Sequence, residues 1–310
     1  MSITFVIPVY NERQTLEALA DGVALHIAPH PYRILFVDDG STDGSYEEMR
    51  RLQAANPAIE IVRLRGNFGK SAALAAGFAK ATGEFVFTMD SDLQDDPREI
   101  PRFLDKIKEG HDVVCGWKAK RHDPFHKTVP SRLYNRFVSW LFSLPLHDVN
   151  CGFKLFRLEV VKKIQLYGEM HRLIPVMAHN LNYRVAEIPV EHHPRRFGKS
   201  KYGFGRFTRG AADVLTMWFL TRYMHAPGHF FAKLGVAQKL LGAALFVAGA
   251  CSWLGGRFIL GPTFFVAGLV LAAAGGLTLC LGLLAELMLR HFVRIDPELY
   301  IAEPGDGPPV

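Results

Sequence analysis

Residues 84–97, EFVFTMDSDLQDDP, join a short apolar run to a dense group of acids. The run is rich in Phe, Val and Thr, as expected for a strand buried on both faces of a sheet. Four aspartates then follow within seven residues: Asp90, Asp92, Asp95 and Asp96. Ligands of open α/β sheets bind beyond the carboxyl ends of the strands. This junction therefore indicates both a parallel sheet and the position of its site.

Further apolar runs of the same kind occur before and after this stretch, and helical patterns separate them. The five strand candidates are ITFVIPV (3–9), YRILFVDD (32–39), IEIVRL (59–64), EFVFTMD (84–90) and HDVVCGW (111–117). Apolar residues recur every three or four positions in the four helix candidates, 12–20, 45–55, 70–81 and 97–108. This alternation predicts an α/β fold with a mostly parallel sheet covered on both faces.

The middle of the chain is mixed, with a helix predicted at 157–164 and a strand at 183–189. A basic, glycine-rich segment follows at 192–209, HHPRRFGKSKYGFGRFTR. Residues 210–224, GAADVLTMWFLTRYM, have a broad apolar face, which predicts a helix that lies at a membrane interface.

Two long uncharged stretches occupy the last quarter, at 240–254 and 258–285. With its flanking residues, each can form a helix of the roughly 20 residues that cross a bilayer. The alternative is a helical hairpin buried in a soluble protein, but a domain of this size can hardly bury both. Basic residues flank the pair (Lys233, Lys239, Arg290 and Arg294), and only Arg257 lies between. The positive-inside tendency predicts that both ends of the pair are cytoplasmic.

The net charge, the cysteines and the first residues limit the class of protein to different degrees. The 310 residues carry a formal charge of +6, which fits nucleic acid, an anionic membrane surface or an anionic substrate equally well. The four cysteines are far apart, so neither a zinc site nor a disulfide framework is indicated. The first residues, MSITFVIPVYNE, lack the pattern of a signal peptide and predict a first strand.

Three phosphate or metal motifs can be set aside. RGNFGKSA and RRFGKSKY resemble P-loops, but Leu64 and His193 stand where a P-loop needs its first glycine. No strand is followed by G-x-G-x-x-G. A calcium loop starting at Asp90 would place Asp95 at its turn glycine and Pro101 at its bidentate glutamate.

The four aspartates are expected to serve two purposes. Asp95 and Asp96 precede Pro97 and are predicted to begin a helix, where carboxylates stabilise the positive end of the dipole. Capping does not account for Asp90 and Asp92. Two neighbouring carboxylates are unfavourable without a cation between them, so a divalent metal with a diphosphate is the favoured interpretation, although a solvated turn stays open. IPVYNE (7–12) and VDDGSTDGS (37–45) end two other strands at the same predicted crevice.

The motifs taken together resemble family-2 glycosyltransferases. They are FVIPVYNE, FVDDGSTDGS, LRGNFGKSAALAAGF, FTMDSDLQDDP, DVNCGFKLF and HHPRRFGKSKYG, in that order over residues 2–210. Within the family they are most similar to the polyprenyl-phosphate branch, which includes dolichol-phosphate mannose synthase and bactoprenol glucosyltransferases. The resemblance implies a GT-A fold, a Mg²⁺ or Mn²⁺ cofactor, and transfer of a hexose from a nucleotide sugar to a polyprenyl phosphate.

The resemblance also implies roles for individual residues. The nucleotide sugar would contact Pro8, Tyr10, Glu12, Val37, Asp39, Lys70, Asp90, Ser91, Asp92, Arg195 and Lys201. Asp92 and Gln94, with Asp90, would hold the metal. The acceptor phosphate would meet basic residues, Arg121 and Arg132 above all, with Lys118 and Lys120 as neighbours. Catalysis would rest on Asp90, Asp92, Arg195 and Lys201, and Asp148 would orient the acceptor or sugar or act as a base.

A phosphate monoester is largely a dianion at neutral pH, so this inverting reaction needs no strong base. UDP-glucose is the favoured donor; GDP-mannose and other UDP-sugars are alternatives. A processive polysaccharide synthase is disfavoured because the sequence has no Q-x-x-R-W motif. A non-catalytic membrane scaffold is the alternative from another class. Nucleic acid is not expected as a partner, whereas self-association is compatible with the branch.

The predicted organisation has four parts. They are a GT-A domain at 1–205, juxtamembrane amphipathic helices at 206–232, two transmembrane helices at 233–289 and a cytoplasmic tail at 290–310. The protein would be a multi-pass protein of the bacterial inner membrane with a cytoplasmic catalytic domain, because a polyprenyl phosphate cannot leave the bilayer.

Overall fold

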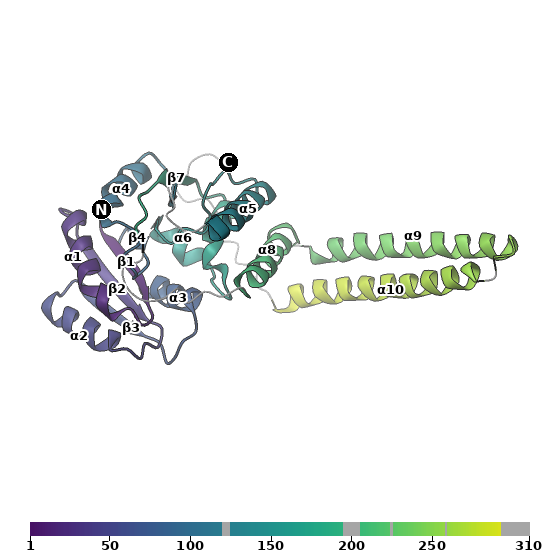
Figure 1. Ribbon diagram of the computed structural model, residues 1–310, viewed down its shortest axis with the longest axis horizontal. Coiled ribbons are helices and arrows are strands. Elements are labelled where there is room, and N and C mark those ends of the chain that lie inside the picture. Colours follow the sequence, from purple (N-terminus) through teal and green to yellow (C-terminus); the bar gives the residue numbers. More distant parts are fainter. Residues whose placement is uncertain (120–124, 195–204, 224–225, 258, 293–310) are drawn as a thin grey trace. The chain divides into compact units, whose positions relative to one another are not determined.

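The computed structural model describes residues 1–119, 125–194, 205–223, 226–257 and 259–292. The chain forms two compact units. The boundary between them lies between Leu215 and Thr216, inside the helix Gly205–Tyr223. The first unit contains the sheet, and the second contains two long helices (Figure 1). The four predicted part boundaries stay predictions.

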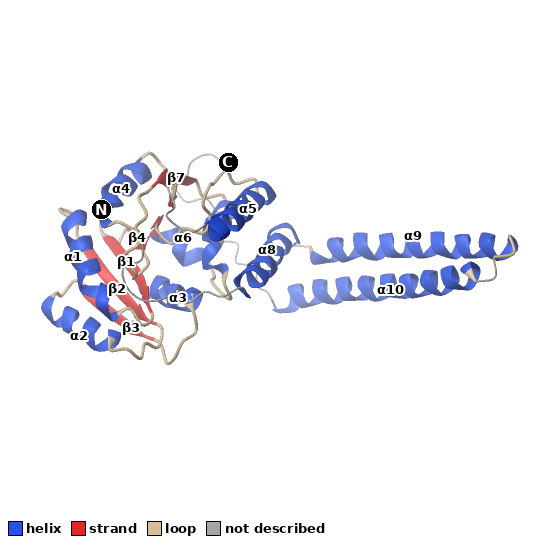
Figure 2. Ribbon diagram, viewed as in Figure 1, coloured by secondary structure: helices blue, strands red, loops and turns tan. Residues whose placement is uncertain are grey.

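The sheet has seven strands in the order β3-β2-β1-β4-β6-β5-β7. Figure 2 shows strands in red and helices in blue. They are β1 Ile3–Val9, β2 Tyr32–Asp38, β3 Ile59–Arg63, β4 Phe85–Thr88, β5 Val113–Trp117, β6 Lys154–Arg157 and β7 Val185–Pro189. All neighbouring pairs are parallel except those that involve β6, which runs antiparallel to β4 and β5. The predicted α/β class and mostly parallel sheet are confirmed, but β6 was not predicted.

Helices connect the strands, and the described part of the second unit is mainly helical. The α-helices are α1 Leu16–Ile27, α2 Ser45–Ala55, α3 Lys70–Lys80, α4 Ile100–Lys108, α5 Phe125–Leu141, α6 Leu158–Lys163, α7 Ile174–Asn180, α8 Gly205–Tyr223, α9 Pro227–Leu254 and α10 Leu260–Phe292. Short 3₁₀ segments are η1 Arg13–Thr15, η2 Pro97–Glu99 and η3 Met170–Arg172. The first helix extends seven residues beyond the predicted end at 20, and α5 and α7 were not predicted.

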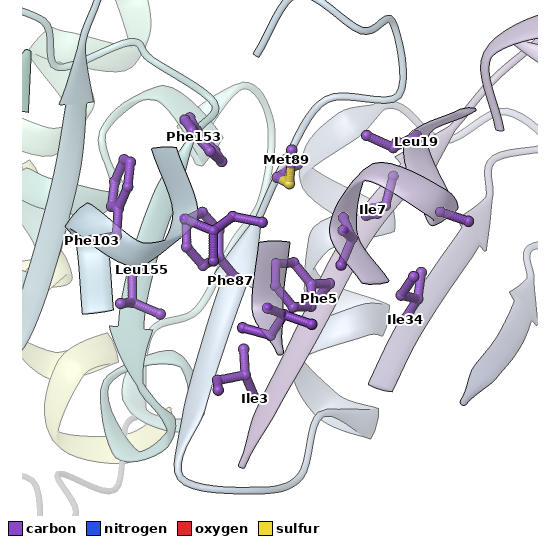
Figure 3. Packing of buried hydrophobic residues seen from close by; sticks show 14 of the residues in the cluster. Ile3, Phe5, Ile7, Leu19, Ile34, Phe87, Met89, Phe103, Phe153 and Leu155 are labelled. Atoms are coloured by element: carbon purple, nitrogen blue, oxygen red, sulfur yellow. The ribbon is translucent and has the colours of Figure 1, made fainter. Parts of the chain in front are cut away.

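The hydrophobic core fixes the strand that carries the acids. The Phe87 ring of β4 stacks on Phe5 of β1 with ring centroids 5.3 Å apart (Figure 3). It also meets Phe103 of α4 and Phe153, each at 5.0 Å. Such aromatic pairs add stabilisation to the burial of their area. The end of β4 is thereby held from three directions, just before the turn that contains Asp90.

A ladder of glycines joins the two helices of the second unit. Glycines recur every seven residues on both helices, at 228, 235, 242 and 249 of α9 and at 261, 268, 275 and 282 of α10. Each lies opposite a glycine of the other helix, and a Cβ added at Gly275 would come 2.7 Å from the Gly235 carbonyl oxygen. A seven-residue repeat keeps one face of a helix toward its partner, and small residues let the backbones approach. The two helices are candidate membrane spans by length and composition.

We expect Gly275→Leu to destabilise this hairpin by about 1–3 kcal/mol, because the new side chain meets the backbone of α9. The neighbouring Gly276→Leu is a matched control, since a Cβ at Gly276 meets nothing within 4 Å. Thermal melting of the full chain in detergent should show a lower Tm for the first variant only. Equal Tm values for the two variants would contradict close packing of the helices.

Candidate active site

The carboxyl ends of β2, β1 and β4 lie side by side, because these strands are parallel neighbours. The chain passes from β1 to β2 and β3 on one side, and then returns to place β4 on the other side of β1. The strand order therefore reverses at β1, where open α/β sheets form a ligand crevice. The acid-containing loops predicted after these three strands all begin at this edge.

Hydrogen bonds tie the loop after β1 to the loop after β2. Asn11 donates its backbone N–H to Ser41 Oγ at 3.0 Å, and its Oδ1 accepts the backbone N–H of Thr42 at 2.7 Å. Asn11 has φ +54°, a conformation that asparagine tolerates better than most residues. The predicted nucleotide residue Glu12 is buried beside it and donates its backbone N–H to Ser45 Oγ. Sequence reasoning missed Asn11, which links these two loops.

The two acids that end β2 hold neighbouring loops in place. Asp39 accepts the backbone N–H groups of Phe68 at 2.7 Å and Gly69 at 3.0 Å. Asp38 pairs with Arg63 of β3 at 3.3 Å. Burial raises the pKa of Asp39, while the two backbone hydrogen bonds act in the opposite direction. Asp39 thus anchors the loop that leads into α3, and its contact with a nucleotide base stays a prediction.

An open cleft of about 550 Å³ lies between the loops after β2 and β3. Its lining residues are Gly40, Ser41, Thr42, Arg63, Leu64, Arg65 and Gly66. The predicted base residue Val37 lies in β2 with its side chain fully buried, whereas Tyr10 is partly exposed. The contacts of Tyr10 and Val37 with a nucleotide base stay predictions.

Lys70, Asp90 and Gly152 meet at the end of β4. The ammonium of Lys70, at the start of α3, donates to Asp90 Oδ1. Burial raises the pKa of Asp90, but the charges of Lys70 and Lys118 and this hydrogen bond outweigh it, and the net pKa lies well below the ordinary range. A Cβ added at Gly152 would lie 2.7 Å from Asp90 Oδ2. Only glycine leaves room for the carboxylate here.

We predict that Gly152→Ala displaces the Asp90 carboxylate and lowers kcat/KM for the reaction that the resemblance implies about 10- to 100-fold, as expected for small displacements of groups in a site. The fold should survive, because the conflict is with a partly exposed side chain. Initial rates and a thermal melt of the purified variant measure the two effects separately. Full activity at an unchanged Tm would show that Asp90 need not occupy this position.

The turn after β4 presents three oxygen-bearing side chains. Asp92 is buried, and its Oδ1 accepts the backbone N–H of Gln94 at 3.2 Å. Leu93 between them has φ +57°, so the chain turns sharply here. The Gln94 side-chain nitrogen donates to the His193 carbonyl at 3.3 Å, which makes its oxygen the amide atom suited to a cation. Asp90, Asp92 and Gln94 together offer the all-oxygen set that Mg²⁺ or Mn²⁺ prefers.

The two later acids differ from the prediction in one respect. Asp96 begins η2 as predicted, since it accepts the backbone N–H of Arg98 at 2.9 Å. The prediction that Asp95 also begins the helix is wrong: Asp95 is buried and pairs with Lys118 at 3.0 Å. Burial lowers the pKa of Lys118, but the charge of Asp95 more than offsets this and the net shift is upward. Sequence cannot show which of two adjacent acids points inward, and the predicted acceptor-side role of Lys118 stays a prediction.

A second group of potential ligand atoms lies nearby. Side-chain atoms of Asp96, Glu191 and His193 lie within 4.8 Å of one another. Asp96 is already held by the Arg98 guanidinium and by His193 Nε2 at 2.8 Å. Burial raises the pKa of Asp96, but its hydrogen bonds with Arg98 and His193 lower it further, so the net shift is downward. This trio is a weaker metal candidate than the set after β4, because its central carboxylate has other partners.

The remaining predicted residues are partly outside the described structure. Asp148 is buried; Asn135 of α5 donates its side-chain N–H to Oδ1 at 3.1 Å, and Asp148 donates its own N–H to Glu187 at 2.8 Å. Arg132 is exposed on α5. Ser91 is buried next to Asp90. Arg121, Arg195 and Lys201, together with Lys120, lie outside the described residues.

A narrow pocket contains two basic side chains that sequence reasoning missed. It lies at the ends of β1 and β4, where Pro8, Lys70 and Asp90 contribute to its lining. Lys154 of β6 and His171 of η3 line the same pocket. A lysine inside the apolar run GFKLF was the only signal of this in the sequence. His171 comes from a segment without a recognisable motif.

The fold and the site define a class of protein. A sheet with a crevice at the reversal of strand order, and an Asp-x-Asp-x-Gln turn beside it, is the arrangement of nucleotide-sugar transferases with a GT-A fold. The family model described as Glycosyl transferase family 2 matches residues 4–165. The chain belongs to this family and is a glycosyltransferase.

Two relatives align with almost the whole chain. Dodecaprenyl-phosphate galacturonate synthase of Rhizobium johnstonii is 35% identical over 310 residues, covering 96% of this chain and 90% of that protein. Undecaprenyl-phosphate 4-deoxy-4-formamido-L-arabinose transferase of Pseudomonas syringae pv. syringae is 33% identical over 308 residues. This alignment covers 96% of this chain and 89% of that protein.

Solved structures share the fold at low identity. Glucosyl-3-phosphoglycerate synthase from Mycobacterium tuberculosis, in complex with Mn²⁺, UDP-glucose and phosphoglyceric acid, aligns with a TM-score of 0.55 at 16% identity. The alignment covers 71% of this chain and 79% of that one. The same enzyme in complex with Mg²⁺ and UDP also gives a TM-score of 0.55. The GT-A fold is confirmed by this likeness.

Proposed function

We propose that this glycosyltransferase transfers a sugar from a UDP-sugar to a polyprenyl phosphate, with inversion at the sugar C1, at a membrane surface. The observation that carries the proposal is the cluster of Lys70, Asp90 and Asp92 at the reversal of strand order. Both relatives with almost full coverage are named for transfer involving polyprenyl phosphates. Their names involve galacturonate and formamido-arabinose, so UDP-glucose stays a prediction without support from them.

The donor would lie across the crevice from the open cleft to the end of β4. The cleft between the loops after β2 and β3 offers room for the base, with Arg63 and Arg65 on its wall. The diphosphate would then reach Lys70 at the N-terminus of α3, where a lysine and the helix dipole both favour negative charge. Arg195 and Lys201 are proposed to contribute further positive charge to the diphosphate.

Asp90, Asp92 and Gln94 would hold Mg²⁺ or Mn²⁺, which would neutralise charge on the departing UDP. The acceptor phosphate oxygen forms the new bond to C1 as the bond from C1 to the UDP oxygen breaks. Lys70 balances charge on the leaving diphosphate. Asp148 orients the acceptor or sugar, since it is fixed by Asn135 and a phosphate dianion needs no strong base.

Helix α5 suits the acceptor side of this site. Leu133, Phe137 and Trp140 recur on one face of α5, and all three are exposed, Trp140 to 74%. Arg132 and Arg136 of the same helix are exposed as well. Large apolar residues beside basic ones suit a helix that lies in the headgroup region of an anionic bilayer. Because Asn135 of α5 contacts Asp148, the helix connects this surface with the site.

The second unit would supply the anchor. We propose that α9 and α10 cross the inner membrane of a bacterium, with the catalytic unit on the cytoplasmic side, where nucleotide sugars are made. Basic residues gather toward the first turns of α9 and the end of α10, whereas only Arg257 lies between the two helices, and this distribution supports the orientation. Self-association remains compatible with the proposal.

The test is transfer by the purified full chain in detergent with undecaprenyl phosphate, Mn²⁺ or Mg²⁺, and a panel of UDP- and GDP-sugars. Formation of one glycolipid, with release of UDP, is the expected result. Inversion is checked by the anomeric configuration of the lipid-linked sugar. If no sugar is transferred from any donor with either metal, a non-catalytic membrane scaffold is favoured instead.

A further inference from the structure

Lys154 is a buried cation in the narrow pocket beside Asp90. Its residue surface is 2% exposed, and its ammonium donates to the carbonyl oxygen of Cys151. Within the part of the chain that the structure describes, no carboxylate oxygen lies within 4.0 Å of it. A buried ammonium is unfavourable unless an anion compensates it. The Lys154 ammonium therefore has no carboxylate beside it among the described residues, and a negatively charged group of a ligand could take that place.

The other groups of the pocket do not supply this charge. Burial raises the pKa of the Cys151 thiol to about 12, so this thiol stays neutral at physiological pH. Asp90 is paired with Lys70. Lys154 is thus the cation of the pocket that lacks an anionic partner among the described residues.

His171 adds a neutral hydrogen-bond donor. Its pKa lies well below the ordinary value, because of burial and the charges of Lys70, Arg172 and Lys154. Ser71 Oγ accepts the backbone N–H of His171 at 3.2 Å and lies 2.9 Å from its Nδ1. With Oγ already an acceptor, its hydroxyl proton is suited to bond Nδ1, and the ring proton then belongs on Nε2. The pocket wall thereby combines the Lys154 ammonium, beside the Lys70–Asp90 pair, with one imidazole N–H.

We infer that this pocket receives the carboxylate of a hexuronic acid, so that the donor is a UDP-uronate rather than a neutral UDP-hexose. The inference rests on the proposed function, because it identifies the sugar class of that same site. One carboxylate oxygen would accept from Lys154 and the other from His171 Nε2. A neutral hexose would bring a hydroxymethyl group to the same place and leave the ammonium without an anion.

Size and position favour a sugar carboxylate over a phosphate. The pocket is enclosed, with a cavity of about 10 Å³, which is room for about one water molecule. A planar carboxylate requires this pocket to open less than a tetrahedral phosphate does. Lys154 pairs in the sheet with Thr88 of β4, two residues before Asp90, and both Lys154 and Asp90 line the pocket.

The test compares UDP-galacturonate and UDP-glucuronate with UDP-galactose and UDP-glucose as donors for the full chain with undecaprenyl phosphate. At least one uronate should exceed its neutral counterpart in kcat/KM by about 100-fold, as expected where a buried polar group would otherwise stay unpaired. Lys154→Met should lower this ratio at least 30-fold. Lys162→Met is the matched control, since Lys162 also donates to carbonyl oxygens, those of Phe78 and Ala79, but on α6.

A second variant and a binding measurement cover the chance that Lys154→Met does not fold. His171→Gln should lower the same ratio about 5- to 20-fold, and the uronate should bind the wild-type chain more tightly than the neutral sugar in calorimetry without acceptor. Two results would overturn the inference while leaving polyprenyl-phosphate transfer intact. One is a preference of the wild type for a neutral hexose donor. The other is a folded variant in which kcat/KM falls equally for uronate and neutral donors. Transfer of no donor would overturn the proposed function, and the inference with it.

Discussion

Asp92→Asn should lower the rate of sugar transfer by at least 100- to 1,000-fold while leaving the chain folded. Loss of one preorganised electrostatic contact to a developing charge has effects of about this size. Asp92 is buried at the turn after β4, where Asp90 and Gln94 complete an oxygen-rich set for a divalent cation. Asparagine keeps the shape and the bond to the Gln94 N–H, but it removes the charge that a Mg²⁺ or Mn²⁺ ligand needs.

The measurement is the initial rate over a titration of Mn²⁺ and Mg²⁺, with a thermal melt of each variant. Asp105→Asn is the surface control, because Asp105 is exposed and pairs with Lys108 on α4. Glu191→Gln separates the two groups of ligand-type residues, since Glu191 belongs to the trio with Asp96 and His193. If Glu191→Gln raises the metal requirement and Asp92→Asn does not, the metal belongs to that trio.

Strands β1 to β5 could be predicted because each is a continuous apolar run between helical patterns. Strand β6 could not, because it has only four residues and begins at Lys154, which interrupts the apolar pattern. Its register against β4 pairs Thr88 with Lys154, so its place depends on a partner 66 residues away. The seven-residue spacing of glycines in α9 and α10 is visible in the sequence, but it was not recognised there as a packing signal.

Sequence reasoning could bring together candidate residues that lie in one loop, but not those that meet from distant segments. Asp90, Asp92 and Gln94 follow one strand, so their proximity is local. The contact of Ser71 with His171 joins residues 100 positions apart, and no local pattern indicates it. Gly152 against Asp90 is similar: the glycine could be seen in the motif NCGFK, but the reason for it could not. The roles of Arg121, Arg195 and Lys201 stay predictions.

Lys118→Met should destabilise the catalytic unit by about 3–5 kcal/mol, which is the usual effect of removing one partner of a buried ion pair. The Asp95 side chain is fully buried, and the Lys118 side chain is 14% exposed. The double variant Asp95→Asn, Lys118→Met should recover most of the loss, because no buried charge is left without a partner. A thermal melt of the full chain in detergent measures the order of the three Tm values.

The dependence of stability on pH follows from the direction of the Lys118 pKa shift. In the wild type, Asp95 raises the pKa of Lys118 despite its burial, so the pair contributes fully below the ordinary lysine pKa and is lost only as pH rises through the raised value. In Lys118→Met the pair is lost at every pH, so the deficit should be constant from neutral pH up to the ordinary lysine pKa. Lys108→Met is the control, since its exposed pair with Asp105 contributes little. A Lys118→Met variant as stable as this control, but inactive, would instead place Lys118 at the substrate.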